Sequence, residues 1–277
     1  MSRSIICVIA VPRTGSNHAV KLLQNCPGLH IASEIFHAAW HSWVPGYIPM
    51  LNEISGGEVV DADSFAAWKA AQPRALVNAM SSARAGVPFV FKLFPRHLEP
   101  EVLHHASFGI ADIGFIIPKR LPIECSISAH KAETQGRWVG LSTTGTRPGL
   151  DVRAFERWAE RTRERYGWVE TETAQRSLAV AQLSHERHIR GNDNRQALAH
   201  LLAALSGLGI KDIEMPAMVK GLAVQDREPD FRKRVAGWDA FEAKASRACP
   251  ALLAWALKAP DEAPAVAREC PTEACTG

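Results

Sequence analysis

Residues 4–11 (SIICVIAV) form a run of apolar, mostly β-branched side chains with no charged position. Continuous runs of this kind are typical of strands buried on both faces of a parallel sheet. Similar runs predict further strands at residues 29–36, 87–94, 113–117 and 177–183. Apolar positions three and four residues apart predict helices at 17–25, 63–85, 122–135, 151–166, 192–205 and 239–258. This alternation predicts one parallel sheet with helices on both faces.

Two expectations concern the ends and continuity of the helix at residues 63–85. Asp63 or Ser64 is the expected N-cap, because a short polar side chain can accept a hydrogen bond from the first free helical amides. Pro73 lacks a backbone N–H and clashes with the preceding turn, so it is expected to break or kink this helix.

The composition is that of an ordinary globular protein. The chain has 277 residues, of which 47% are hydrophobic and 22% are charged, which excludes wholesale disorder and fibrous repeats. This length is ample for a buried core. We therefore expect a single domain over residues 1–258, followed by a disordered Pro/Ala/Glu-rich tail over residues 259–277.

Neither a membrane span nor a secreted protein is indicated. The longest clean apolar run, residues 5–11, is far shorter than the roughly 18–20 residues of a membrane helix. The start of the chain lacks the charged, apolar and cleavage regions of a secretory signal. The six cysteines form no C-x-x-C pair and have no zinc spacing. We expect reduced thiols in a cytoplasmic protein.

The charge balance favours a small anionic ligand over a large anionic surface. The net charge, 32 − 29 = +3 with neutral histidines, is too small to indicate nucleic acid or an anionic membrane. Arginine outnumbers lysine by 22 to 10. Because guanidinium groups bind phosphates and carboxylates through paired hydrogen bonds, this excess favours an anionic ligand. A codon bias toward Arg and Ala explains it equally well.

A polar loop leads from the first predicted strand into the first predicted helix. A short glycine-containing turn of this kind directs several backbone N–H groups at one point, where the helix N-terminus adds about half a positive charge. The 12–17 loop is therefore a candidate phosphate site, and an ordinary connection with polar caps is the alternative. It lacks the G-x-x-x-x-G-K-[S/T] pattern of nucleoside triphosphatases. Its residues are Pro12, Arg13, Thr14, Gly15, Ser16 and Asn17.

A second candidate anion site combines Arg120 and Ser128. Arg120 follows the predicted strand at 113–117, and the carboxyl end of a strand is the usual ligand edge of an open α/β sheet. Ser128 lies about two turns into the next predicted helix. A tight turn between them would let both side chains converge on one anion. A surface arginine and an unrelated helical serine are the alternative.

Glu34 is the candidate general base. It lies at the end of the second predicted strand, and we expect it at the same edge as the 12–17 loop because the first two strands are predicted to be parallel neighbours. A carboxylate in this position suits proton transfer. The spacing of two nearby histidines is weak evidence for a metal ion, and no metal site is expected. The other nearby candidates are His37, His41, His97 and Lys92.

Together these motifs resemble those of sulfotransferases that use 3′-phosphoadenosine-5′-phosphosulfate (PAPS), most closely the bacterial branch with trehalose and nodulation-factor sulfotransferases. In that family a Pro-Arg-x-Gly-[Ser/Thr] loop after the first strand binds the 5′-phosphosulfate. An Arg at a strand end and a Ser eight residues later hold the 3′-phosphate, and Arg120 and Ser128 match them. The branch often has [Gly/Ser]-Glu-x-Phe after its first helix, which residues 33–36 match, with Glu34 as the proposed base. The resemblance extends over residues 4–240.

The resemblance implies a P-loop-like three-layer α/β fold with a central, mostly parallel sheet flanked by helices. It also implies metal-independent transfer of a sulfuryl group from PAPS to a hydroxyl of a small-molecule, carbohydrate or glycolipid acceptor, with 3′,5′-adenosine bisphosphate as product. Glu34 would take the acceptor proton, and Arg13 with the loop amides would neutralise charge on the 5′-phosphate. Residues 38–60 and 140–150 are expected to form the acceptor pocket. Trp40, Trp43 and Tyr47 lie in the first of these segments, where they pack on the acceptor or in the core.

Three positions depart from the family pattern. Asn17 stands where Thr is common, and no Asp or Asn follows Arg120. Cytosolic members have Lys-Thr-His in the third strand, whereas this chain has Lys92, with Phe94 in the place of the His and His97 three residues late. This favours Glu34 over a histidine as the base and leaves open whether Lys92 acts at the transferring sulfuryl group.

Two other functions would retain the 12–17 loop. These are a P-loop kinase-like phosphotransferase and a non-catalytic nucleotide-binding protein. The missing lysine of the triphosphatase pattern argues against the kinase, and a magnesium requirement would favour it. The oligomeric state stays open between a monomer and a homodimer.

Overall fold

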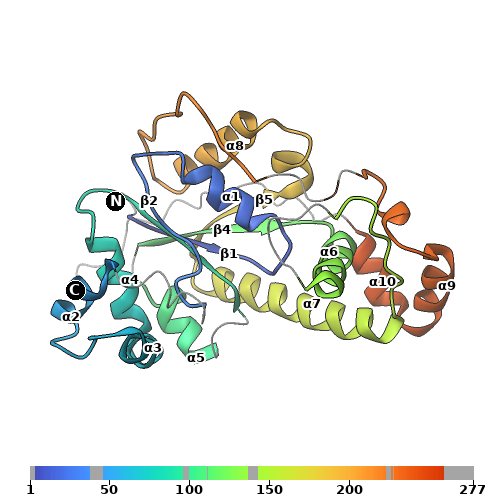
Figure 1. Ribbon diagram of the computed structural model, residues 1–277, viewed down its shortest axis with the longest axis horizontal. Helices are drawn as coiled ribbons and strands as arrows, with labels where there is room; N and C mark the ends of the chain where they lie inside the picture. Colours follow the sequence, from blue (N-terminus) through green and yellow to red (C-terminus); the bar gives the residue numbers. More distant parts are fainter. Residues whose placement is uncertain are drawn as a thin grey trace.

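The computed structural model describes residues 4–37, 46–95, 100–110, 112–136, 143–222, 226 and 228–258. Five strands form one sheet in the order β2-β3-β1-β4-β5, and every neighbouring pair is parallel (Figure 1). Helices cover both faces of the sheet, so the predicted three-layer α/β class is confirmed. The strands are β1 (Ile5–Ile9), β2 (His30–Ala32), β3 (Phe89–Leu93), β4 (Ile113–Lys119) and β5 (Ala179–Ser184).

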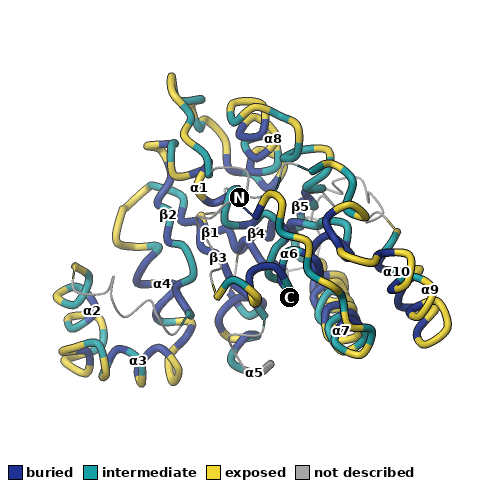
Figure 2. The backbone as a smooth tube through the Cα atoms, turned by 45° about the vertical axis from the view of Figure 1, so that its right-hand side comes forward, coloured by how far each residue is buried: buried dark blue, intermediate teal, exposed yellow. Residues whose placement is uncertain are grey.

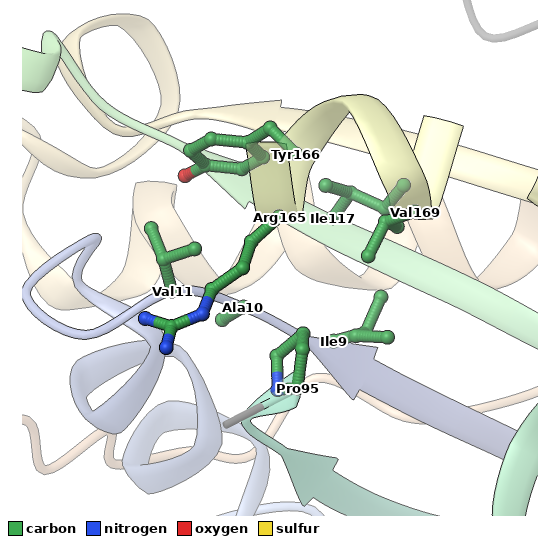
Figure 3. Close-up of a pocket in the computed structure, with 8 residues that line it drawn as sticks. All are labelled: Ile9, Ala10, Val11, Pro95, Ile117, Arg165, Tyr166 and Val169. Atoms are coloured by element: carbon green, nitrogen blue, oxygen red, sulfur yellow. The ribbon is translucent and has the colours of Figure 1, made fainter. Parts of the chain in front are cut away.

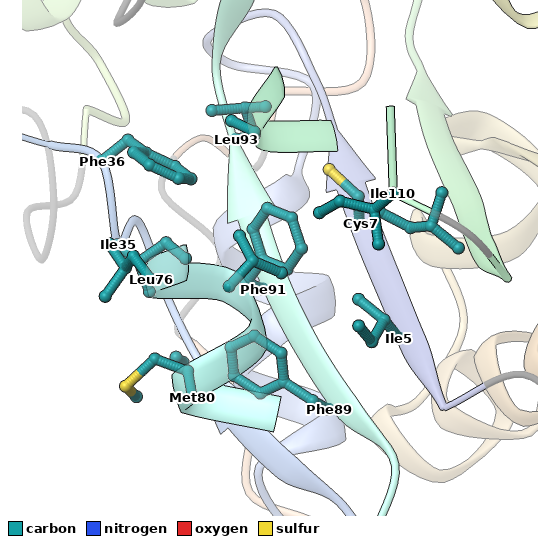
Figure 4. Packing of buried hydrophobic residues seen from close by; sticks show 14 of the residues in the cluster. Ile5, Cys7, Ile35, Phe36, Leu76, Met80, Phe89, Phe91, Leu93 and Ile110 are labelled. Atoms are coloured by element: carbon teal, nitrogen blue, oxygen red, sulfur yellow. The ribbon is translucent and has the colours of Figure 1, made fainter. Parts of the chain in front are cut away.

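Alternate residues of the central strands face two separate apolar clusters. On one face, Cys7 of β1 and Phe91 of β3 belong to a cluster that includes Leu76 (Figure 4). This face packs against α3 (Ala62–Ala71), α4 (Pro73–Ser82) and α7 (Val152–Gln175). On the other face, Ile6 and Val8 pack with α1 (Ser16–Leu23) and α8 (Asn194–Gly207). The first run of the sequence is continuously apolar because both faces of β1 are buried.

A third apolar cluster lies among helices near the end of the sheet. It joins α6 (Pro122–Gln135) and α7 to α9 (Trp238–Ala248) and α10 (Pro250–Leu257). Phe155 of α7 and Phe241 of α9 meet edge to face there, with ring centroids 5.4 Å apart. Figure 2 shows the strands and α6 largely buried, whereas α9 exposes its outer face.

β1 and β2 are not neighbours, contrary to the prediction. β3 lies between them, with Phe89 aligned to Ile5 on one side and to His30 on the other. Burial explains the order, because all five positions of β3 are buried, whereas β2 has three residues and a half-buried Ile31. A very short strand suits the edge of a sheet, where it leaves little backbone unpaired.

The helix predicted at residues 63–85 is two helices, α3 and α4. Pro73 was expected to break or kink this helix. It breaks the helix and is the first residue of α4. The predicted N-cap is wrong, because Asp61 caps α3 and Ser64 closes the capping box from the third helical position. A side chain can cap only the helix that starts just after it, and α3 starts at Ala62.

Three other elements differ markedly from the prediction, whereas the remaining boundaries are displaced by at most two residues. The strand predicted at 29–36 is confined to β2 because residues 33–37 form a turn. The helix predicted at 151–166 continues to Gln175, since Val169 and Thr173 extend its buried face. The helix predicted at 239–258 is divided at Cys249, because Pro250 begins a second helix.

The remaining described elements are short. They are α2 (Ile48–Ile54), α5 (Pro100–Leu103), the π-helical turns η3 (His104–Phe108) and η4 (His185–Ile189), and the 3₁₀ turn η5 (Phe231–Arg234). None of the helices in the described ranges has both the length and the apolar character that crossing a membrane requires. Four cysteines, Cys7, Cys26, Cys125 and Cys249, are buried free thiols. The predicted tail at 259–277 lies outside the described residues.

Candidate functional site

The backbone of the 12–17 loop has features that suit the predicted anion site. Arg13 and Gly15 both have positive φ angles, 74° and 86°. Gly15 caps α1, and its carbonyl accepts the amide of Ala19 at 3.0 Å. The amides before Ala19, those of Ser16 and Asn17 among them, therefore have no partner within the helix. Amides in this position attract an anion together with the helix dipole.

A side-chain hydrogen bond, burial and close packing fix the conformation of the 12–17 loop. Thr14 is buried, and its hydroxyl donates to the carbonyl of Val11 at 3.0 Å. Ser16 is buried as well. Gly15 packs so tightly against His185 that a Cβ added to Gly15 would lie 2.6 Å from Cδ2 of His185. Both the positive φ and the close contact therefore require glycine at this position.

Lys92 connects the loop to the candidate base. Its side chain, on β3, is fully buried, and its Nζ lies 2.5 Å from Oε1 of Glu34. The same ammonium group donates a hydrogen bond to Oδ1 of Asn17. Burial lowers the pKa of Lys92, while Glu34 opposes this shift by favouring the charged form. The ammonium group thus lies between a residue of the 12–17 loop and a partly exposed carboxylate.

Glu34 lies close to the loop although its strand is not adjacent to β1. After β2 the chain turns, with the amide of His37 donating to the carbonyl of Glu34 at 2.9 Å. The amide of Lys92 donates to the carbonyl of Ser33 at 3.0 Å and ties this turn to β3. Because Lys92 extends from the intervening strand, it links Glu34 to the loop across that strand.

Arg13, Arg120 and Ser128 come together at the other end of the loop. Nε of Arg13 donates to Oγ of Ser128 at 2.9 Å. Nη1 of Arg120 donates to the carbonyl of Arg13 at 3.1 Å. Burial and then the neighbouring Arg120 lower the pKa of Arg13. Arg13 therefore contacts both residues that the sequence placed in a separate anion site, Ser128 through its side chain and Arg120 through its carbonyl.

Glu124 is buried among three guanidinium groups and was not among the residues predicted from the sequence. Arg120 donates to its carboxylate through Nε at 3.1 Å and Nη2 at 2.7 Å. Arg190 donates at 2.7 Å, and Nη1 of Arg234 lies 3.6 Å away. Burial would raise the pKa of Glu124, but these arginines outweigh it and hold that pKa below its ordinary value. Arg120 and Glu124 are four residues apart, a spacing that brings side chains together on one side of a helix. This spacing was the sequence feature that could have indicated the ion pair.

Two further carboxylates extend this network, and neither was predicted from the sequence as a site residue. Oδ2 of Asp226 lies 2.6 Å from Nζ of Lys131 and 3.8 Å from Nε of Arg234. Oε1 of Glu186 accepts the amide of Leu121 at 3.0 Å, directly after Arg120. Residues from α6, η4 and the segment before η5 are thus connected beside the 12–17 loop. Their sequence separation explains why no local pattern indicated them.

Some candidates lie outside the described residues, namely His41, His97, Trp40, Trp43, and residues 38–45 and 140–142 of the two expected acceptor segments. Tyr47 is described, and it packs against the apolar cluster that contains Cys7. This contact agrees with core packing, one of the two roles expected for Tyr47. Among the residues that the structure describes, no group of three or more His, Cys, Asp or Glu side chains is arranged to hold a metal ion.

No known protein-family profile matches the chain, and no curated protein sequence matches it. Among solved structures, the sulfotransferase domain of the Synechococcus PCC 7002 olefin synthase is 17% identical, with 73% of this chain and 72% of that chain covered and a TM-score of 0.43. A sulfotransferase from Alicyclobacillus acidocaldarius is 16% identical, with coverages of 92% and 99% and a TM-score of 0.44. A sugar kinase from Janibacter sp. HTCC2649 is 15% identical, with coverages of 74% and 95% and a TM-score of 0.34. Likenesses this distant assign no reaction, so we infer the function from the residues of this chain.

Proposed function

We propose that the protein is a PAPS-dependent sulfotransferase that transfers a sulfuryl group to a hydroxyl of a small-molecule or carbohydrate acceptor. The observation that carries this proposal is the linkage of Glu34 through Lys92 to Asn17 of the 12–17 loop. A carboxylate suited to proton abstraction thereby lies beside a loop suited to a phosphate.

The donor set fits the two phosphate groups of such a cofactor. The first amides of α1 suit the 5′ end, as described above. Three of the five N–H donors of Arg120 are used by Glu124 and the Arg13 carbonyl, which leaves donors for a 3′-phosphate. Ser128 is half-buried and accepts from Arg13, so its own O–H can still donate.

In this proposal, the bound cofactor supplies the sulfuryl group and the 3′-phosphate by which it is recognised. Glu34 accepts the proton of the acceptor hydroxyl as the new oxygen–sulfur bond forms. Lys92 holds the carboxylate of Glu34 in place through the contact described above. The amides of the 12–17 loop stabilise the negative charge that develops on the leaving phosphate oxygen. Arg13 and Arg120 add positive charge at the α6 end of the loop.

Differential stabilisation by nucleotides tests the proposal. The full chain is melted with 3′,5′-adenosine bisphosphate, AMP, or ATP with Mg²⁺. Saturation at a hundred times the dissociation constant adds about 2.7 kcal/mol, on the order of 5–10 °C in Tm for a chain of this size. The bisphosphate should stabilise most, and Ser128→Ala should reduce its advantage over AMP by removing one donor to the 3′-phosphate.

Ser128→Ala is preferred to Arg120→Ala because Arg120 is also a counter-ion of the buried Glu124, and its loss could prevent folding. Ser126→Ala, at another hydroxyl on α6, is the matched control and should leave the advantage intact. Greatest stabilisation by ATP with Mg²⁺ would favour the kinase alternative and contradict the proposal. So would sulfuryl transfer that EDTA abolishes and Mg²⁺ restores.

A further inference from the structure

The start of the 12–17 loop is supported from both faces of the sheet, and the two supports differ in chemistry. On the α7 face, Figure 3 shows apolar side chains of β1 and β4 packed around a small pocket. None of the described residues that line this pocket is a histidine or a carboxylate. On the opposite face, Ile189 of η4 packs against the apolar cluster that contains α1 and α8. Of these two supports, η4 is the one with histidines, whose side chains titrate near neutral pH.

Two consecutive residues of η4 contact different parts of the proposed nucleotide site. His185 packs closely against Gly15, as described above. Oε1 of Glu186 accepts the amide of Leu121, which directly follows Arg120. A displacement of η4 would therefore disturb the 12–17 loop and the segment that carries Arg120 together.

A histidine of η4 ties this turn to the end of β5. The amide of Ser184 donates to Nδ1 of His188 at 3.0 Å, and the hydroxyl of Ser184 accepts the amide of Arg187 at 3.3 Å. Nδ1 can accept a hydrogen bond only while it carries no proton, so the first bond requires a neutral His188. Ser184 is both the last residue of β5 and the N-cap of η4. The bond to His188 therefore fixes how the turn leaves the sheet.

The surroundings of His188 oppose its protonation. Its ring centroid lies 5.0 Å from that of His200 on α8, and from β5 the uncharged amide of Ser184 faces its Nδ1. Burial, followed by His200 and Arg187, lowers the pKa of His188 from its ordinary value of 6.5. A displaced η4 would therefore bind this proton more readily than the packed one. Proton uptake thus favours displacement as the pH falls below about 6.5.

We propose that His188 is a positioning residue of the nucleotide site, which holds η4 against the 12–17 loop when neutral and releases it when protonated. The inference rests on the proposed function, because it concerns how tightly that site binds its nucleotide. It adds a dependence on pH that the loop residues themselves do not supply, since none of residues 12–17 titrates near neutral pH.

Calorimetric titration of the full chain with 3′,5′-adenosine bisphosphate at about pH 7.5 and about pH 5.5 tests this proposal. His188→Asn keeps an amide oxygen as acceptor, which takes up no proton in this range. The wild type and this variant should bind equally at the higher pH. At the lower pH the wild type should bind about 3- to 10-fold more weakly than the variant, since one proton allows at most about tenfold per pH unit. Comparison at the same pH cancels the protonation of the ligand's own phosphates.

Two further histidine variants sharpen the test. His200→Asn removes the neighbouring imidazole, so the pKa of His188 should rise toward its ordinary value and acid should weaken binding less than in the wild type. This variant also covers the case in which His188→Asn fails to fold. His104→Asn is the matched control, because His104 lies in η3, a π-helical turn that precedes β4, and burial lowers its pKa as well. It should follow the wild type at both pH values.

Hydrogen exchange read by mass spectrometry measures the release of η4 without a ligand. Peptides that contain the amides of Ser184 and Leu121 should lose protection in the wild type at the lower pH, after correction for the intrinsic rate, and keep it in His188→Asn. Unchanged protection, or wild-type affinity that does not fall in acid, would overturn the proposal. So would equal pH dependence in the wild type and a folded His188→Asn, which would assign the effect to His185.

The two proposals fail in different ways. If the bisphosphate binds no better than AMP, the proposed function is wrong, and the same comparison with AMP, whose 5′-phosphate uses the same loop, still decides the role of His188. If the bisphosphate binds as expected but its affinity in acid does not depend on His188, only the proposed role of His188 is wrong.

Discussion

Nζ of Lys92 lies 2.5 Å from Oε1 of Glu34, and the two side chains differ sharply in exposure, 0% for the lysine and 22% for the glutamate. The buried ammonium group is therefore paired with a carboxylate that solvent can reach. Burial lowers the pKa of Lys92, and the neighbouring Glu34 opposes that shift by favouring the charged form of the lysine. This pair connects the edge of the sheet to the 12–17 loop.

Glu34→Gln should abolish turnover while leaving the affinity for 3′,5′-adenosine bisphosphate nearly unchanged. The substitution keeps the shape of the side chain but removes the proton acceptor, which typically costs about 10²–10⁴-fold in rate. Steady-state kinetics and calorimetry measure the two quantities. His37→Gln, in the same turn, is the control and should retain activity. Turnover at the wild-type rate in Glu34→Gln would instead move the base to His37 or His97.

Glu124→Gln should destabilise the fold because it leaves the guanidinium groups of Arg120, Arg190 and Arg234 without their shared carboxylate. Removing one partner of a buried ion pair costs about 3–5 kcal/mol in the free energy of unfolding. Urea denaturation measures this cost. Glu133→Gln, on the same helix but 63% exposed, should change it little. Equal stability of the two variants would show that Glu124 is not the centre of the network.

Gly15→Ala should disrupt the 12–17 loop for two separable reasons. The added Cβ would lie 2.6 Å from the ring of His185, and the φ of 86° is unfavourable for alanine. The melting temperature and the affinity for the bisphosphate should both fall. His185→Ala in the same chain should recover part of the stability by removing the contact, but not the part caused by φ. Gly167→Ala, in open space on α7, should be neutral or stabilising. A fully stable Gly15→Ala would contradict the contact.

Acid stability should depend on Glu186. Burial alone would raise the pKa of Glu186. The hydrogen bond with His185 and the amide of Leu121 outweigh this effect and lower that pKa from 4.5 to about 2. A depressed carboxyl pKa stabilises the fold above the ordinary value of 4.5, and that contribution is lost as the pH falls toward 2. Glu186→Gln should therefore be less stable at neutral pH and lose less stability across this window. Urea midpoints against pH measure it, with the exposed Glu164→Gln as control. Parallel curves for wild type and Glu186→Gln would exclude this role.

Local sequence was sufficient for features that depend on neighbouring residues. The apolar run at 4–11 predicted β1 because both of its faces are buried, and Pro73 was expected to interrupt a helix because proline has no amide hydrogen. The polar loop after β1 also followed from adjacent residues. Its glycine has the left-handed backbone that such a turn requires.

The sequence alone determined the three-layer class, the position of the 12–17 loop and the choice of Glu34, Lys92, Arg120 and Ser128 as candidates. Only the tertiary structure decided the strand order, in which β3 separates β1 from β2. It also decided that Arg13 donates to Ser128 and that Glu124 forms ion pairs with three arginines. The physical reason is the sequence separation over which each kind of interaction acts. Strand periodicity and turn chemistry act between residues a few positions apart, whereas strand order and ion pairing depend on which distant segments share one buried space. The separation of 115 residues between Arg13 and Ser128 lies beyond any local pattern.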